Sequence, residues 1–329
     1  MFQEPFSRRE LIRASIAVGA AGALAREAAA AEKTPMLTPE EMAAVDAALG
    51  KKGNAVADQA VYTVPLPRSD LKVRIQGDPV PTPFGFGGWV SFKRTADGKS
   101  TVMMSDIVLL PEEVNGVLTT AQANGIEVTA LHNHFVYEEP RVMFMHVHGM
   151  GTPADLAQAY AAAIRPTKVF PANQPPAGPP PARTGAEIFD VPALDRITGY
   201  KAAVNGPTVK YTVGRADLRV MAMGAEITAA IGLNSWASLT GTAERAHVAG
   251  DIAMLEPEVN PVIAALRKNR LEVVALHHHM IGEDPRIIFL HYYGTGPAAE
   301  LAQGFRAALD ELGKHGKSYR MRPMRGRHG

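Results

Sequence analysis

The chain has 329 residues, of which 46% are hydrophobic and 20% charged, with a formal net charge of +1 and no cysteine. This length and composition exclude an intrinsically disordered protein and suggest one large domain or two of ordinary size. The absence of cysteine excludes disulfides, thiolate chemistry and an acylated lipoprotein cysteine, while the balanced charge argues against a dedicated nucleic-acid binder.

Residues 1–31 have the pattern of a twin-arginine signal peptide. The motif Ser7–Arg13 precedes a mildly apolar run, Ala14–Leu24, and an Ala-rich stretch, Ala28–Ala31, offers a cleavage site. The alternative is an amphipathic first helix whose arginines are solvated. The signal predicts export through the twin-arginine pathway to the periplasm, or secretion from the cell.

The body of the chain contains an internal repeat. Ala130–His134 aligns with Ala275–His279, and Asp106 aligns with Asp251 at the same offset of 145 (251 − 106). The predicted organisation is repeat 1 at 32–165, a Pro-rich linker at 166–184, repeat 2 at 185–313 and a basic flexible tail at 314–329.

Each repeat is predicted to be an α+β sandwich with the core order β-β-α-β-β-α, an antiparallel sheet and helices on one face. The first helix begins at the capping box of Thr38 and Glu41. In repeat 1 the following elements are then predicted in chain order: strands at 61–64, 71–75, 89–93 and 102–109, a helix at 111–123, strands at 127–134 and 141–148, and a helix from 152 or 153 to 164. The two repeats are expected to pack as a pseudo-twofold pair.

The histidines concentrate on the last two strands of each repeat. Side chains two positions apart on a strand share a face, so His132 and His134 point together, as do His146 and His148. A hairpin centred on Pro140 would place His134 opposite His146 and His132 opposite His148. Four imidazoles would then form a compact square.

The second repeat carries His277, His279 and His291, with Tyr293 in the fourth position. Imidazole suits zinc, copper, iron and nickel, so each repeat is predicted to hold a divalent transition metal, with zinc or copper favoured. The alternative is that these histidines are hydrogen-bonded core residues that bind no metal.

Four carboxylates are candidate acid/base residues. Glu138 and Glu283 precede the Pro-Arg pair of each repeat and could ligate a metal or move a proton. Asp106 and Asp251 interrupt apolar strands, where a carboxylate is costly unless it is paired. They are predicted either to orient the histidines or act as a general base, or to form an ion pair with the arginine of that Pro-Arg pair.

Ala-Leu-His-x-His, Glu-(Glu/Asp)-Pro-Arg and Phe-x-His-x-x-Gly each occur twice, and this combination resembles the LppY/LpqO family of exported bacterial proteins. The resemblance covers roughly residues 43–312. It implies an exported domain of unknown function in two tandem copies rather than a particular chemistry. Members of that family can be lipoproteins, whereas this chain has no cysteine to acylate.

These features predict a periplasmic metal-binding protein, with a metal-dependent hydrolase or lyase as its catalytic form. The alternative is a non-enzymatic module that binds a cell-wall or carbohydrate ligand, in which Trp89 and Trp236 would stack on the ligand instead of anchoring the core. A small-molecule or cell-envelope ligand is expected in either case. No nucleic-acid partner and no transmembrane segment in the mature chain are expected.

Overall fold

The computed structural model describes residues 34–176, 178 and 180–314. The predicted signal peptide and the part of the basic tail beyond residue 314 lie outside this range. Within the range, no helix combines the length and apolar character needed to cross a bilayer. The compact unit that begins at Pro35 contains both repeats.

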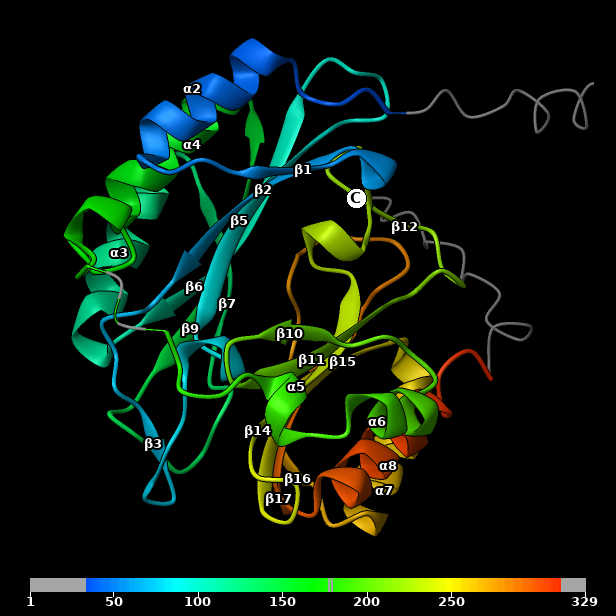
Figure 1. The fold of residues 1–329 in the computed structure, drawn as a ribbon. Helices are drawn as coiled ribbons and strands as arrows, with labels where there is room; N and C mark the ends of the chain where they lie inside the picture. Colours follow the sequence, from blue (N-terminus) through cyan, green and yellow to red (C-terminus); the bar gives the residue numbers. More distant parts are fainter. Residues whose placement is uncertain (1–33, 177, 179, 315–329) are drawn as a thin grey trace, which may run out of the picture. The chain divides into compact units, whose positions relative to one another are not determined.

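The first repeat folds as a six-stranded antiparallel sheet with helices on one face (Figure 1). In spatial order the strands are β1 (Asn54–Val56), β2 (Val61–Pro67), β5 (Gly87–Arg94), β6 (Thr101–Leu109), β9 (Met143–Gly151) and β7 (Glu127–His132). The helices are α2 (Pro39–Leu49), α3 (Pro111–Ala123) and α4 (Pro153–Ile164). The capping box of Thr38 and Glu41 begins α2 as predicted.

The second repeat has the same topology. Its strands, in spatial order, are β10 (Ala203–Asn205), β11 (Thr208–Gly214), β14 (Asn234–Gly241), β15 (Ala246–Met254), β17 (Ile288–Gly296) and β16 (Glu272–His277). Its helices are α6 (Val191–Thr198), α7 (Val259–Lys268) and α8 (Ala298–Leu309). The prediction of two tandem α+β repeats with antiparallel sheets is therefore confirmed.

Short elements connect the main ones. The predicted strand 71–75 is reduced to β3 (Arg74–Ile75), which lies between β4 (Asp78–Pro79) and β8 (Glu138–Glu139) in a small sheet. A second small sheet pairs β12 (Val220–Ala222) with β13 (Ala225–Ile227). The remaining elements are η1 (Ala57–Gln59), η2 (Thr82–Phe84), η3 (Pro171–Asn173), α5 (Gly185–Ile188), η4 (Ala229–Ile231) and η5 (Glu256–Glu258).

In each repeat, one face of the sheet packs against that repeat's own helices, and the other face packs against the opposite repeat. The helix-facing cores stay within one repeat each. Two further apolar clusters mix the repeats: one joins Val102 and Met104 of β6 to Phe289 of β17, and the other joins Phe144 of β9 to Ala249 of β15. Because burial of apolar surface drives association, these mixed clusters hold the two sheets together, and polar side chains on the shared faces are brought into one interior.

Each repeat also buries one arginine at the end of its second strand. In repeat 2 the Arg215 guanidinium binds Glu258 at 2.7 Å and Asp217 at 2.8 Å, and it donates to the Ala253 carbonyl at 2.7 Å. Arg68 repeats this pattern in repeat 1. These charge-assisted hydrogen bonds tie the second strand to the turn before the following helix.

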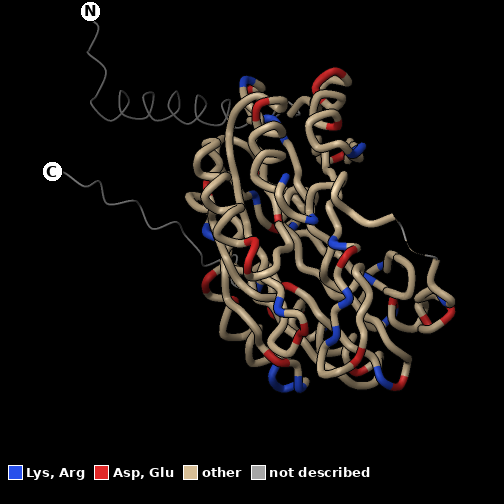
Figure 2. Tube along the Cα trace, turned by 90° about the vertical axis from the view of Figure 1, so that its left-hand side faces the viewer, with Lys and Arg blue, Asp and Glu red and all other residues tan. Residues whose placement is uncertain are grey.

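Basic and acidic residues alternate along the described trace and do not separate into blocks of one sign (Figure 2). This distribution agrees with the formal net charge of +1.

Candidate metal centre

The strands that carry the histidines pair in a different register from the predicted one. Ala130 of β7 lies opposite His146 of β9, and His132 lies opposite Phe144. The predicted hairpin about Pro140, which set His132 opposite His148, is therefore wrong by four positions along β9 (148 − 144). The cause is the connection: residues 133–142 form a loop whose β8 segment pairs with β3, so the two strands are not joined by a tight turn at the proline.

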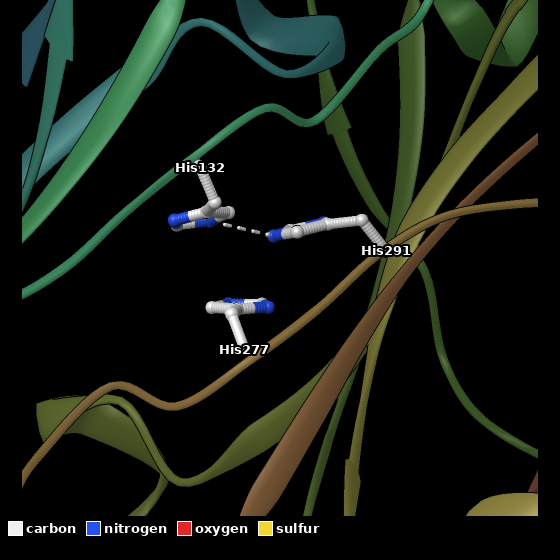
Figure 3. A group of neighbouring side chains, drawn as sticks. All are labelled: His132, His277 and His291. Atoms are coloured by element: carbon white, nitrogen blue, oxygen red, sulfur yellow. Dashed lines mark hydrogen bonds between the residues drawn. The ribbon is translucent and has the colours of Figure 1, made fainter.

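The structure brings six of the predicted histidines into a single cluster shared by both repeats. They form three close pairs, each with one ring from each repeat; two pairs are stacked, and the third, His146 with His279, is tilted by 31°. The pairs are His132 with His277, His134 with His291, and His146 with His279, at ring-centroid distances of 3.8, 3.7 and 4.1 Å. Two separate sites, one in each repeat, had been predicted, and the structure instead forms one site between the repeats. Figure 3 shows three of its members, His132, His277 and His291.

The fourth position of each repeat points elsewhere. His148 is buried, and its Nε2 lies 2.9 Å from a carboxylate oxygen of Glu127. Its counterpart Tyr293 shares a hydrogen bond of 2.7 Å with Nδ1 of His247. His148 was predicted as a metal ligand, but it does not stack with the six clustered rings and belongs to this separate contact.

Backbone carbonyls fix the orientation of three of the rings. Nδ1–H of His146, His279 and His291 donates to a carbonyl oxygen in each case. The acceptors are Ser105 at 3.2 Å, Gly232 at 3.0 Å and Gly250 at 3.0 Å, respectively. A neutral imidazole that donates from Nδ1 keeps the lone pair on Nε2, so these three rings present the nitrogen that a metal ion would bind.

Two glycines make room for these contacts. A Cβ on Gly250 would lie 2.2 Å from the Trp236 carbonyl oxygen and 2.3 Å from the Tyr292 hydroxyl. Gly232 has a φ of 106°, in the region where a side chain is strained. Glycine at 250 therefore lets the backbone lie against Trp236 and Tyr292, and glycine at 232 allows the positive φ beside His279.

Two groups of three histidines have ligand atoms close enough to hold one ion. The atoms of His132, His277 and His291 lie within 4.8 Å of one another, and so do those of His146, His277 and His279. Nε2 of His132 is 3.2 Å from Nε2 of His291. Two nitrogens bound to the same tetrahedral ion at about 2.0–2.1 Å would be separated by a similar distance. His277 is common to both groups.

Asp106 and Asp251 adjoin the cluster from the neighbouring strands. Asp251 Oδ2 lies 3.2 Å from Nε2 of His279 and 3.9 Å from Nε2 of both His277 and His291. Asp106 Oδ2 lies 3.9 Å from Nε2 of His134. Of the two roles predicted for these aspartates, the geometry favours contact with the histidines over an ion pair with arginine.

Glu138 and Glu283 have a different environment from the one predicted. Glu138 contacts Arg141 at 3.3 Å, and Glu283 contacts Arg286 at 3.2 Å. Each glutamate also accepts a backbone N–H four residues further along the chain. They hold the loop between the two histidine strands together, and the prediction that they serve as acid/base residues at the histidines is not supported by this placement.

Burial controls the protonation of the cluster. Desolvation, reinforced by the neighbouring imidazoles, lowers the pKa of His132, His134 and His277 far below the usual histidine value. Burial lowers the pKa of His279 to about 3 and that of His291 to about 4. All of these rings are therefore neutral at pH 7, which is the state that binds a metal ion.

The two aspartates shift in the opposite direction. Burial raises the pKa of Asp251 to about 6, and burial together with the nearby Asp251 raises the pKa of Asp106 to about 8. A carboxyl with a pKa near neutrality can exchange a proton under physiological conditions.

Many polar atoms of the cluster have no hydrogen-bond partner among the described residues. They are both ring nitrogens of His134 and His277, Nδ1 of His132, Nε2 of His146, and Oδ1 of Asp106 and Asp251. Each such buried atom costs about 1–3 kcal/mol. A cation bound between neutral imidazoles and carboxylates would accept one ring lone pair from each ligating histidine and lone pairs of the carboxylates, so the residues present fit a metal ion.

A cleft of about 220 Å³ leads to one side of the cluster. Its walls come from both repeats and include His134, His279, His291, Asp106, Asp251, Trp89, Trp236 and Lys210. The tryptophans also pack against the mixed apolar clusters, so they combine the two roles that the sequence left open. Lys210 was missed by the sequence analysis, although a lone lysine between Val209 and Tyr211 in an apolar strand was a detectable signal.

These features define a class: a two-repeat α+β protein with one histidine centre between its repeats. The family described as Domain of Unknown Function (DUF1259) matches residues 43–166 and 192–311, which together are more than half of the chain. The chain belongs to this family, and the two matched segments correspond to the two repeats.

No curated protein matches the chain. Two solved structures are similar to it at 14% identity: the trimeric bacterial microcompartment shell protein PduB, and the fused permuted hexameric shell protein of the RMM microcompartment. The match to PduB covers 78% of this chain and 89% of the PduB chain, with a TM-score of 0.19. The match to the fused shell protein covers 65% of this chain and 85% of that protein's chain, with a TM-score of 0.18. Similarity at this level supports no conclusion about fold or function.

Proposed function

We propose that this protein binds a single transition-metal ion in a centre that its two repeats build together. The observation that carries the proposal is the cluster of six imidazoles, five of them buried, in three close cross-repeat pairs, with polar atoms left without partners. A set of imidazoles with nearby carboxylates suits zinc or copper best. The twin-arginine motif and the resemblance to the LppY/LpqO family support export of the folded, metal-loaded protein to the periplasm.

The cleft supports a catalytic role as a metal-dependent hydrolase or lyase. A metal ion bound by neutral histidines lowers the pKa of a coordinated water to about 7. Asp106 and Asp251 line the cleft beside the ligand nitrogens, and their raised pKa values suit them to take up and return a proton there. Because the cleft also reaches His279 and His291, a small substrate can approach the centre.

A carbohydrate-binding module remains the second candidate, because both tryptophans line the cleft. A cleft of about 220 Å³ has room for a single ring but not for a chain of sugar rings. An extended cell-wall glycan would need a longer groove. The volume therefore favours a small-molecule site at a metal ion.

Elemental analysis of the mature protein, isolated from the periplasm without chelator, tests this proposal. We expect stoichiometric zinc or copper in the wild-type protein and in the loop variant Glu138→Gln. His277→Ala, which removes the ligand common to both groups, should lose metal, and added zinc or copper should no longer raise its melting temperature. Wild-type protein that contains no transition metal, and whose melting temperature does not respond to either ion, would refute the proposal.

A further inference from the structure

The cleft is asymmetric at one position although the repeats are alike around it. Lys210 on β11 pairs with Ser238 on β14, and Thr63 on β2 pairs with Ser91 on β5 in the same way. Both Lys210 and Thr63 line the cleft. The second repeat therefore supplies a cation where the first supplies a hydroxyl, so a ligand in the cleft has one preferred orientation.

Among the described residues, the Lys210 ammonium has no carboxylate partner within salt-bridge distance. The lysines that do form salt bridges in the described part of the chain are Lys99, Lys201 and Lys314. Nζ of Lys210 instead lies 4.4 Å from the ring centroid of Trp236. The indole attracts the cation on one side and leaves its N–H donors free to bind a ligand.

The charges around the cleft favour an anion of single charge. Lys210 is the one basic side chain among the residues of the cleft wall, and Asp106 and Asp251 lie on the same wall. One carboxylate of a ligand can pair with this single lysine, whereas a second anionic group would find no further lysine or arginine on the wall and would lie near the charge of Asp251. The tryptophans add apolar wall on which a ring can pack.

The size of the cleft limits the rest of the ligand. An engineered apolar cavity of about 150 Å³ binds benzene. A cleft of about 220 Å³ therefore accommodates one six-membered ring together with a carboxylate group.

We propose that the cleft binds a small cyclic monocarboxylate, with its carboxylate on Lys210 and its ring against Trp89 and Trp236. This inference rests on the proposed function, because the cleft that holds the ligand opens onto the proposed metal centre. It adds the chemical class of the substrate or ligand to that proposal.

Tryptophan fluorescence tests the inference, because Trp89 and Trp236 are the only two tryptophans in the chain. Metal-loaded full-length protein is titrated with benzoate, with benzyl alcohol as the neutral analogue and with inorganic phosphate as the anion of higher charge. The variant is Lys210→Met. The matched control is Lys93→Met, which removes a buried lysine that lies outside the cleft wall. The metal content of every sample is measured before the titration.

We expect saturable binding of benzoate by the wild-type and Lys93→Met proteins. Loss of one charge-assisted contact should weaken benzoate at least about tenfold in Lys210→Met, with the metal content unchanged. Benzyl alcohol and phosphate should bind more weakly than benzoate to the wild-type protein. Equal benzoate affinity in Lys210→Met and wild type, no benzoate binding at all, or tighter binding of phosphate would overturn the inference.

The two proposals fail in different measurements. Protein that contains metal but does not bind benzoate contradicts the ligand class alone. Protein without metal contradicts the proposed function, whatever the result of the titration.

Discussion

The six clustered histidines should make the metal-free protein sensitive to mild acid. Their pKa values are lowered by burial in the folded protein, whereas each returns to about 6.5 on unfolding. Below pH 6.5 the unfolded chain therefore binds more protons than the folded protein, and stability falls as the pH falls. Each histidine contributes a loss of about 0.7 kcal/mol between pH 7 and pH 6, so the six contribute about 4 kcal/mol.

Asp106 and Asp251 oppose this trend. Their folded pKa values, about 8 and about 6, lie above the ordinary value of 3.8, so the folded protein binds the additional proton and gains stability on acidification. Between pH 7 and pH 6, protonation of the two aspartates raises the free energy of unfolding by about 1.7 kcal/mol. The net expected loss is about 2 kcal/mol between pH 7 and pH 6, and about 5 kcal/mol more by pH 5.

Urea unfolding of chelator-treated protein at several pH values measures this effect as a change in the free energy of unfolding. His279→Gln removes one of the six groups and should reduce the loss between pH 7 and pH 6 by about 0.7 kcal/mol. A free energy of unfolding that stays constant or rises from pH 7 to pH 5 would refute the reasoning, because it would mean that the histidines can protonate inside the folded protein.

Two paired substitutions test the packing that supports the centre. Gly250→Ala should lower stability by about 1–3 kcal/mol or more, because its Cβ would collide with Tyr292. Gly116→Ala in helix α3 should instead raise stability by about 0.5–1 kcal/mol. Thermal unfolding compares the two variants, and an equal effect on stability would contradict the crowding at Gly250. Arg215→Met should cost about 3–5 kcal/mol, because it leaves the fully buried carboxylate of its partner unpaired. Arg270→Met breaks an ion pair in which the arginine side chain is 87% exposed and should change stability by less than about 0.5 kcal/mol; similar losses in the two arginine variants would show that burial does not govern the cost.

Local signals in the sequence were sufficient for most elements of the fold. The helix predicted at 111–123 has the same bounds in the structure, because Pro111 fixes its first turn and Asn124-Gly125 ends it. The alternation of side chains along strands predicted that His132 and His134 point together, and their ring centroids lie 5.2 Å apart in the structure. The domain boundaries and the location of the protein in the periplasm or outside the cell remain predictions.

The arrangement of the site depends on contacts between distant parts of the chain. The register of β7 and β9 follows from the pairing of β8 with β3, and neither the length of the loop nor Pro140 reveals that pairing. The stacking of His132 on His277 depends on how the two sheets pack against each other. This packing cannot be predicted from the sequence of one repeat. Lys210 was missed because the repeats were compared for what they share, and this residue is a difference between them.

The central claim is that the two repeats share one metal centre, and the metal content of histidine variants from each repeat tests it most directly. Elemental analysis should find one ion per chain in the wild type and in His148→Ala, whose side chain contacts Glu127 instead of the cluster. The double variant His132→Ala/His146→Ala removes the repeat 1 ligand of both groups, and His277→Ala removes the repeat 2 ligand common to both. Each of these two variants should lose all of the metal while circular dichroism shows that it remains folded. Two ions per wild-type chain, with half of the metal retained in each of these variants, would contradict a shared centre and indicate one independent site in each repeat.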